Sequence, residues 1–388
     1  MNTIPLAPVA QDQRLSNLDV LRAVTLLGVL LVNLLTEFRV SVFEQWFPDS
    51  AAATEDRALD RFVALAIEFK AIVLFSFLFG VGLAIQFDRC QRAGRGFAGH
   101  VARRFGSLLV LGLLHLTLLW NGDVLTLYAL VGFLALPLLG RRRSLLPIAV
   151  VLLALFLAPL PYPEPFPDAE TMRAHIRLAN RIYAHGSYAE VQAFRWRELP
   201  AILALLFAVL PRTLGLFALG IWAWRAQVFA SPARVTLLRR SAWIGVLAGG
   251  AATLLSAGVF GDIPLGAAGR VVYGTAPIAL ALGYGALLLW LYERPLARRW
   301  LSLLAPLGRM ALSNYLLQSL IFGWVFYGYG LGRFGTMSST RAAILGIAVY
   351  LCQAVASHYW LRRFRFGPVE WLWRSATYAA WQPFARSR

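Results

Sequence analysis

Residues 106–139, GSLLVLGLLHLTLLWNGDVLTLYALVGFLALPLL, constrain the fold of this chain more than any other stretch. They read as two apolar helices joined by the short polar turn WNGD, residues 120–123. Each arm is close to the ~20 residues that an α-helix needs to cross the hydrocarbon core of a bilayer at about 1.5 Å of rise per residue. The first arm carries His115 and the turn carries Asp123. Because ionisable side chains at membrane depth are costly, both are candidate functional residues.

Apolar segments of the same kind recur along the whole chain. Hydrophobic residues make up 59% of the 388 residues and charged residues only 14%, and the mean hydropathy is +0.62. Such a chain cannot bury its apolar surface in one water-soluble core, so we predict an all-α polytopic membrane protein with about ten transmembrane helices. The predicted helices are residues 18–38, 71–86, the two arms of 106–139, 145–160, 199–224, 243–260, 272–292, 307–327 and 342–360.

The formal net charge of +18 arises largely from arginine clusters that lie between the apolar segments. The clusters occupy residues 89–104, 141–143, 234–240 and 294–299. This distribution is typical of the positive-inside rule and not of a nucleic-acid-binding surface, so we expect no nucleic-acid partner. It predicts a multi-pass membrane protein with both termini in the cytoplasm.

The same pattern divides the chain into three regions. We predict a polar cytoplasmic lead (residues 1–17), a transmembrane helical domain (18–361) and a basic, Trp-rich cytoplasmic tail (362–388). Within the transmembrane domain, the outer segment 161–198 is amphipathic in its middle, so we expect it to lie partly in the membrane interface. Its histidines have no third ligand at metal spacing, and we therefore expect no bound metal ion.

The first predicted helix carries three polar residues, Asp19, Arg22 and Asn33. Asp19 and Arg22 lie one helical turn apart, as in an ion pair at the start of a helix. The alternative is that Arg22, together with Arg309, binds the phosphates of a coenzyme A donor, since guanidinium groups suit bidentate phosphate contacts. Asn33 is either an interhelical hydrogen-bonding residue or a dipole in a catalytic site.

Asn33 and His115 are predicted to lie at a similar depth. Asn33 follows Arg22 by eleven residues and His115 follows Arg104 by eleven, which places each about 16 Å beyond its arginine. We therefore expect the two side chains to line one polar cavity, with Asp123 nearer its outer mouth. His115 is either a hydrogen-bonded structural histidine or a general base. Asp123 is either a simple turn residue or the group that orients that base.

A further polar pair, Asn314 and Gln318, lies in the predicted helix 307–327. The two residues are one helical step apart, so both amides lie on one face of the helix. They either connect two helices by hydrogen bonds or line a cavity and bind the substrate.

Several segments together resemble one family of membrane proteins. They are LSNLDVLRAVTLLGVLLVN (15–33), LFSFLFGVGLAIQ (74–86), GLLHLTLLWNGDVLTLYAL (112–130), and GRMALSNYLLQS (308–319) with RFRFGPVEWLWRSATY (363–378). Their order makes nearly the whole chain similar to the YeiB-like inner-membrane family, long classed as a domain of unknown function. Through its first helix, that family is similar to the membrane enzymes that O-acetylate surface polysaccharides and to the heparan-glucosaminide acetyltransferase. The heparan-type enzymes place a catalytic histidine soon after the position of Asn33, whereas this chain has no histidine between Asn33 and Lys70.

The resemblance implies a transmembrane acyltransferase. It would move an acyl group from a cytoplasmic acyl-coenzyme A, such as acetyl-coenzyme A, to a small-molecule or glycan acceptor reached from the outer side. Membrane lipids and a second copy of the chain are further candidate partners. The alternative is a transporter or flippase for a small amphipathic molecule or lipid, which would use the same polar residues as a pathway. Under the first interpretation the catalytic residues are His115, Asn33 and Asp123, the donor-binding residues Arg22 and Arg309, and the substrate-binding residues Asn314 and Gln318.

Overall fold

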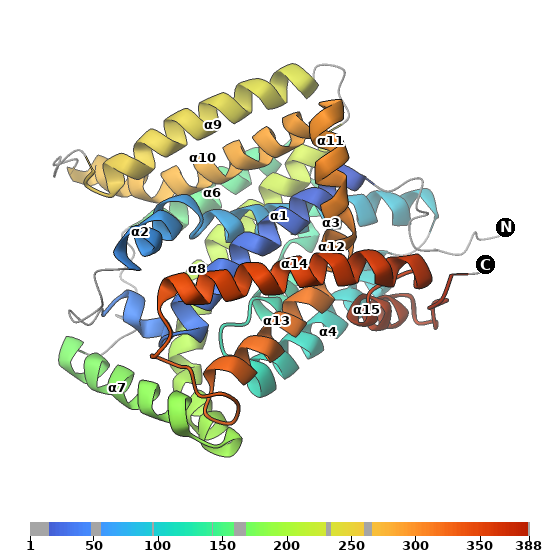
Figure 1. The fold of residues 1–388 in the computed structure, drawn as a ribbon. Helices are drawn as coiled ribbons and strands as arrows, with labels where there is room; N and C mark the ends of the chain where they lie inside the picture. Colours follow the sequence, from blue (N-terminus) through green and yellow to red (C-terminus); the bar gives the residue numbers. More distant parts are fainter. Residues whose placement is uncertain are drawn as a thin grey trace.

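The computed structural model describes residues 15–47, 56–94, 97–141, 143–158, 168–229, 234–259 and 266–386. In these ranges the chain is helical, and the only β-type pairing is one isolated bridge between Phe364 and Ala385. The helices pack as one bundle (Figure 1). The predicted all-α fold is therefore confirmed for the described residues, while most of the predicted lead 1–17 lies outside them.

Long helices form most of the bundle. They are α1 (Ser16–Asn33), α3 (Lys70–Arg92), α4 (Phe97–Leu114), α8 (Tyr188–Arg225), α9 (Arg234–Ser256), α10 (Gly266–Tyr292) and α14 (Ser339–Arg363). Shorter helices complete it, namely α2 (Arg57–Ala66), α5 (Leu125–Leu134), α6 (Leu145–Leu157), α7 (Ala169–His185), α11 (Pro295–Leu301), α12 (Ala305–Arg309), α13 (Ala311–Phe326) and α15 (Pro368–Tyr378). Every apolar segment predicted from the sequence overlaps at least one of these helices.

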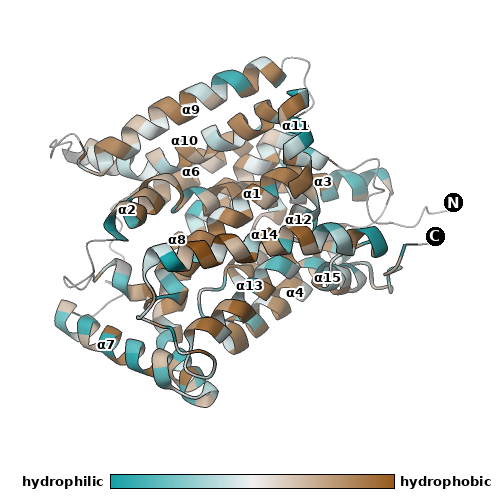
Figure 2. Cartoon of the chain, in the orientation of Figure 1, coloured by the Kyte–Doolittle hydropathy of each residue, from teal (hydrophilic) through white to brown (hydrophobic). Residues whose placement is uncertain are grey.

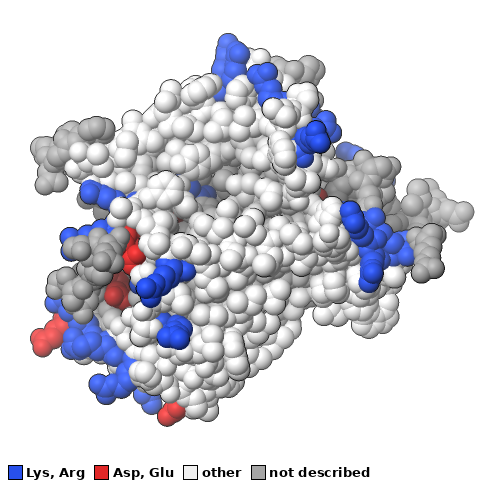
Figure 3. Space-filling view, viewed as in Figure 1, with Lys and Arg blue, Asp and Glu red and all other residues white. Residues whose placement is uncertain are grey.

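Six of the described helical stretches are long and apolar enough to cross a membrane. They are Ser16–Phe38, Arg57–Arg92, Phe97–Leu119, Tyr188–Arg225, Val271–Tyr292 and Ser339–Arg363. The apolar helices α5, α6 and α13 are shorter, at 10–17 residues. Hydrophobic residues make up much of α4, α9 and α13 (Figure 2), and some of them are exposed, among them Val110, Ile244 and Trp324. A broad uncharged surface separates charged groups near two ends of the molecule (Figure 3), as expected of a membrane protein.

Glycines allow the central helices to approach closely. A Cβ on Gly80 of α3 would collide with the backbone of Phe217 in α8, and one on Gly220 of α8 would collide with the backbone of Phe77. A Cβ on Gly308 of α12 would likewise collide with the carbonyl of Asp19 in α1. Small residues at such crossings let backbones meet where apolar lipid gives helices no hydrophobic reason to associate. The start of α1 is thereby held against α12.

The structure corrects the length of the second hairpin arm. α5 has only ten residues and is followed by a 3₁₀ helix, Leu136–Gly140, instead of a continuous span. Pro137 lies at the start of that 3₁₀ helix, and proline disfavours the α conformation in the residue before it. The WNGD turn is also buried in the bundle, with Trp120 and Asp123 each 1% exposed and Trp120 stacked on Phe38 at 4.3 Å between ring centroids.

Helix α8 differs from expectation in the opposite sense. Residues 199–224 are predicted as one span, but the helix is longer and runs unbroken through Pro200 and Pro211 for 38 residues. It begins earlier, at Tyr188, with a capping box in which the Ser187 hydroxyl accepts from the N–H of Glu190 and the Glu190 carboxylate accepts from the N–H of Ser187. The well-capped start and tight packing against α3 and α6 outweigh the lost hydrogen bonds at the prolines.

Candidate functional site

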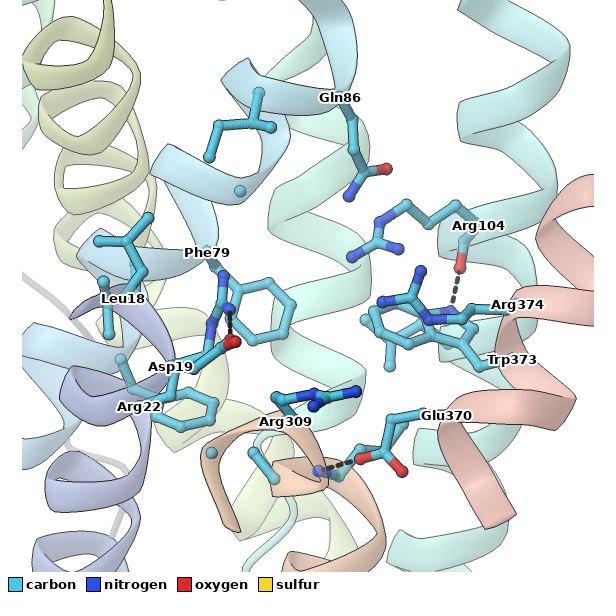
Figure 4. Close-up of a pocket in the computed structure, with 18 of the residues that line it drawn as sticks. Leu18, Asp19, Arg22, Phe79, Gln86, Arg104, Arg309, Glu370, Trp373 and Arg374 are labelled. Atoms are coloured by element: carbon cyan, nitrogen blue, oxygen red, sulfur yellow. Dashed lines mark hydrogen bonds and ion pairs between the residues drawn. The ribbon is translucent and has the colours of Figure 1, made fainter. Parts of the chain in front are cut away.

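A cavity of about 580 Å³ opens among α1, α3, α4, α12, α13 and α15 (Figure 4). Its lining includes six arginines: Arg22, Arg89, Arg92, Arg104, Arg309 and Arg374. The guanidinium groups of Arg104, Arg309 and Arg374 point into the same space (Figure 4). Arg104 also lies over the ring of Trp373 at 3.9 Å, a cation–π contact that fixes its direction.

Three carboxylates accompany these arginines, and each has its own partner. The Asp19 Oδ1 lies 2.8 Å from the Arg22 Nη1, so the ion pair expected at the start of α1 is present. The Trp224 indole donates to the Asp88 Oδ2 at 2.8 Å. Among the described lining residues, six guanidinium groups thus accompany three carboxylates. An anion would reduce the mutual repulsion of the arginines.

Glu370, the third carboxylate, is buried in the structure. Its Oε1 accepts the N–H groups of Leu312 (2.8 Å) and Ser313 (3.0 Å), and its Oε2 accepts the Ser313 hydroxyl (2.5 Å). Glu370 of α15 therefore satisfies the free N–H groups at the start of α13. Burial raises the pKa of Glu370, although these hydrogen bonds oppose the shift.

The inner part of the cavity is apolar. The lining residues at the start of α1 and along it run from Leu15 to Val29, a rise of about 20 Å along the helix axis. Arg22 lies in the first half of this run, and the lining residues that follow it on α1 are apolar. The apolar lining side chains are Leu26, Val29, Ile72, Phe75, Phe79, Leu108, Val124 and Leu125. The cavity is therefore amphipathic, with cationic groups at one end and apolar walls at the other.

His115 lies behind this apolar end, at a change in helix geometry. The α-helix of α4 stops at Leu114, and residues His115–Leu119 form a π-helical turn in which the N–H of Trp120 donates to the carbonyl of His115 at 2.8 Å. Single π-turns inside helices are frequent at functional sites. Here the turn ends the span and is followed directly by the buried WNGD segment.

Both ring nitrogens of His115 are hydrogen-bonded within the protein. The Nδ1 lies 2.8 Å from the Asp123 Oδ1, and the Nε2 lies 2.8 Å from the Ser319 Oγ. Asp123 also accepts the N–H groups of Leu125 (3.1 Å) and Thr126 (2.7 Å) at the start of α5. Because Asp123 is the acceptor in these two bonds, we assign the Nδ1 proton of His115 to the bond with Asp123. The Nε2 then accepts the Ser319 hydroxyl proton.

Tyr315 lies between the cavity and this Asp123–His115–Ser319 chain. It is one of the lining residues, and its ring lies 5.1 Å from the His115 ring between centroids. His115 itself is 1% exposed and is not a lining residue. The hydrogen-bonded chain is therefore directly behind the cavity floor and enclosed by side chains.

The structure brings together some of the predicted site residues and not others. Arg22 and Arg309 line the same cavity, and Asp123 orients His115 through a hydrogen bond. Asn33, half-buried at the end of α1, is not a lining residue, so the cavity described here is lined by neither Asn33 nor His115. Whether these two side chains share a second polar space stays a prediction.

Asn314 and Gln318 lie in a hydrogen-bonded contact between α13 and α14. The Asn314 Nδ2 donates to the Ser357 Oγ at 3.0 Å, and the Gln318 Nε2 donates to the Gln353 Oε1 at 2.8 Å. The Gln353 Nε2 returns a bond to the carbonyl of Asn314 at 3.0 Å. These contacts agree with the first alternative, in which the two amides connect helices by hydrogen bonds. Neither side chain lines the cavity.

Reasoning from the sequence missed several residues of the site, namely Ser319, Arg104, Arg374, Glu370 and His100. Ser319 is 204 residues from His115, and its only local signal is that it follows Tyr315 by four residues, on the same helix face. His100 is buried and lines the cavity. In the described ranges, no group of three or more His, Cys, Asp or Glu is placed to hold a metal ion.

A second buried polar group, the Glu198 cluster, consists of Glu198, Asn121, Tyr183 and His175. The Glu198 Oε2 accepts the Asn121 Nδ2 at 2.8 Å and the Tyr183 hydroxyl in a short hydrogen bond, and its Oε1 lies 3.0 Å from the His175 Nε2. Burial, with the charge of Glu198, holds the pKa of Tyr183 well above its usual range, so this hydroxyl remains a donor. The cluster ties α7 and α8 to the WNGD turn.

Bacterial proteins resemble this chain over almost its entire length. It is 33% identical to the "Uncharacterized protein YxaH" of Bacillus subtilis (strain 168), over 98% of both chains. It is 29% identical to the "Uncharacterized protein YeiB" of Escherichia coli (strain K12), over 96% of this chain and 98% of the relative. The family described as "Protein of unknown function (DUF418)" matches residues 223–380, a range that includes Arg309, Ser319 and Arg374.

Proposed function

This chain belongs to the family of YxaH and YeiB, and within that family we propose that it is a transmembrane acyltransferase with an acyl-coenzyme A donor. One observation carries the proposal: the cavity combines six arginines with an apolar interior, and its floor residue Tyr315 contacts the hydrogen-bonded His115. Clustered guanidinium groups suit phosphates, and an apolar interior suits an acyl group.

The donor would bind with its phosphates among the arginines. Arg22 is held by Asp19 on α1, and Arg309 lies at the end of α12, which Gly308 places against the α1 backbone. Arg104 and Arg374 complete the ring of cations from α4 and α15. Four helices would thus contribute to one phosphate site, and donor binding would hold them together.

His115 would act as the general base of the transfer. With Nδ1–H donated to Asp123, the neutral ring keeps a lone pair on Nε2, the form required to accept a proton. Asp123 would stabilise the imidazolium that forms, and its two backbone hydrogen bonds hold the carboxyl group in place.

The membrane orientation is part of the same proposal. The arginine clusters favour ten spans in the bacterial inner membrane, with the cavity mouth and both termini in the cytoplasm. Single cysteines introduced at Ser187 and Ser144, in a variant lacking Cys90 and Cys352, test it in intact cells. Labelling by an impermeant maleimide is expected at position 187 and not at position 144, and the reverse pattern would overturn the orientation.

Donor binding tests the proposed function directly. Acetyl-, octanoyl- and palmitoyl-coenzyme A are added to the purified protein, and a bound donor should raise its melting temperature because it stabilises only the folded state. At 100 times the dissociation constant the gain is about 2.7 kcal/mol. Arg22→Gln and Arg309→Gln should each lose most of this gain, whereas Arg177→Gln, on the exposed face of α7, should keep it. No stabilisation by any acyl-coenzyme A would reject the proposal.

The enclosure of His115 supports a second candidate, a transporter or flippase for an anionic amphipathic molecule. In that case the cavity would hold the cargo, and the Asp123–His115–Ser319 chain would only join α4, α5 and α13. An anionic lipid that stabilises the protein, without stabilisation by any acyl-coenzyme A, would favour this candidate.

A further inference from the structure

The hydroxyl of Ser319 is the only side-chain group within hydrogen-bonding distance of the His115 Nε2 among the described residues. We propose that Ser319 is a nucleophile that accepts the acyl group before it reaches the final acceptor. This inference rests on the proposed acyltransferase function and adds a covalent step to it. If His115 is the base, the proton nearest to it is that of Ser319, at 2.8 Å between the Oγ and the Nε2.

The hydrogen-bond directions agree with this role. Asp123 is an acceptor for two backbone N–H groups and for the Nδ1–H of His115, which leaves the Nε2 as an acceptor. The Ser319 hydroxyl therefore has a base directly at its proton. Its other neighbour, the carbonyl of Tyr315 one turn earlier, is 3.3 Å away and is the weaker acceptor. A nucleophile, a base and an orienting carboxylate within hydrogen-bonding reach are the components of an activated serine.

The position of Ser319 on α13 connects it to the donor cavity. Ala311, Leu312 and Tyr315 line the cavity, and Ser319 continues their helix face about 6 Å further along the axis. Rotation of the Tyr315 ring away from His115 would open the floor toward the hydroxyl. In the position that the structure shows, the rings of Tyr315 and Trp120 lie 5.1 and 6.0 Å from the His115 ring between centroids. They enclose His115 and exclude water from it. A dry enclosure protects an acyl ester from hydrolysis.

The chemistry balances in two steps. In the first, the Ser319 Oγ attacks the thioester carbonyl while the His115 Nε2 takes its proton. The carbon–sulfur bond then breaks, and the thiol of coenzyme A leaves with that proton. In the second, a hydroxyl or amine of the acceptor attacks the serine ester, His115 takes the acceptor's proton and returns it to the Ser319 Oγ, and the acylated acceptor leaves.

The test looks for the covalent intermediate. The protein is incubated without acceptor with radiolabelled acetyl-, octanoyl- and palmitoyl-coenzyme A, quenched in acid and digested with trypsin. The label is expected on the peptide Met310–Arg333, which follows Arg309 and ends at the next arginine. It should resist neutral hydroxylamine, as oxygen esters do, and the peptide of Ser319→Cys should instead carry a hydroxylamine-labile thioester.

Turnover of the variants separates this role from a structural one. Ser319→Ala should lose the label and at least about 100-fold in turnover. The double variant Ser319→Ala with His115→Gln should turn over about as slowly as the slower single variant. The losses do not add, because the two residues act as one catalytic unit. Ser76→Ala is the matched control. Ser76 is a buried helical serine with the same bond to the carbonyl four residues earlier and a hydroxyl partner, Tyr128, across the helix contact. It should keep both label and turnover.

Two outcomes would overturn the inference. If acyl transfer proceeds without label on this peptide, or if Ser319→Ala keeps turnover within about twofold, the acyl group passes directly to the acceptor and the acyltransferase proposal stands alone. If no acyl-coenzyme A binds or reacts, the proposed function fails, and the serine step fails with it. Melting temperatures of all variants show whether a loss of turnover reflects loss of folding.

Discussion

The arginine-lined cavity and the Glu198 cluster are both polar regions inside an apolar bundle, yet they are built in opposite ways. In the Glu198 cluster, one buried carboxylate is surrounded by three donors, and side chains occupy the space. In the cavity, six arginines face three carboxylates that already have partners, around about 580 Å³ of open volume. The first arrangement is complete within the protein. The second surrounds an open space that a ligand could occupy.

This contrast separates two reasons for placing polar groups in a membrane protein. A satisfied cluster adds specificity to helix packing, and its removal should affect folding. An unbalanced, hollow one has a cost that only a ligand offsets, and its removal should affect function. The Asp123–His115–Ser319 chain lies between the two types, because it is fully hydrogen-bonded but adjoins the cavity through Tyr315.

The largest expected effect distinguishes His115 from Glu198. His115→Gln should reduce acyl transfer by roughly 10²–10⁴-fold, since a general base typically contributes that much to a rate. Glu198→Gln should leave the rate per folded molecule within a few-fold of the wild-type rate. The two variants are matched, because each replaces a buried titratable side chain with the amide of glutamine. Turnover is measured with saturating donor and normalised to folded protein. Equal losses in the two variants would remove the functional distinction between the regions.

Stability should show the reverse order. Glu198→Ala leaves the Asn121 amide and the Tyr183 hydroxyl without their buried acceptor, which costs roughly 1–3 kcal/mol for each stranded group. Arg22→Gln, at the half-exposed end of the cavity, should cost less than about 1 kcal/mol. Thermal unfolding in one detergent compares the two. A larger loss for Arg22→Gln would mean that the cavity arginines hold the fold together.

Filling the apolar interior tests whether the cavity receives an acyl chain. Ile72, a half-buried lining residue of α3, faces the inner part, and Ile72→Trp should weaken binding of palmitoyl-coenzyme A about tenfold, or ~1.4 kcal/mol. Coenzyme A itself, which would use only the arginines, should bind unchanged. Val24→Trp, on an exposed side of α1, is the control and should affect neither ligand. Equal weakening of both ligands would place the acyl chain elsewhere.

The smallest expected effect concerns pH. Burial raises the pKa of Glu370 above its usual 4.5, so the folded protein binds this proton more tightly than the unfolded chain. The associated stability is present at low pH and is lost as the pH rises through the folded pKa. The melting temperature of wild type should therefore fall more between about pH 5 and about pH 8 than that of Glu370→Gln, which cannot ionise. A steeper fall in the melting temperature of Glu370→Gln with rising pH would contradict a raised pKa for Glu370.

The sequence was sufficient to predict the helices, because each apolar segment is about the length of a membrane span and is bounded by arginines or prolines. One of the alternatives for Arg22 placed it beside Arg309, and one for Asp123 made it the group that orients His115; the structure places Arg22 and Arg309 in one cavity and Asp123 within hydrogen-bonding distance of His115. Ser319 could not be predicted in the same way. A serine is common in membrane helices, and only the packing of α13 against α4 makes it a partner of His115.

Other features depended on balances that local patterns do not reveal. The brevity of α5 follows from Pro137, whereas α8 continues through Pro211, so the same residue type ended one helix and not another. Tertiary packing decided between the two cases. Glu370 lies among tryptophans in the sequence, but its carboxylate caps a helix at Ser313, 57 residues earlier in the chain, a contact that no sequence spacing indicates.

The π-helical turn at His115–Leu119 also has a consequence for how such proteins diverge. A π-turn holds one residue more than an α-turn, so deletion of a single residue between Leu114 and Trp120 would let the helix close regularly. The residues beyond the deletion would rotate by about 100°, and His115 would no longer face Asp123. Length, hydropathy and topology would hardly change. In evolutionary terms, a one-residue gap at this turn would therefore mark a lineage that keeps the scaffold and abandons the chemistry.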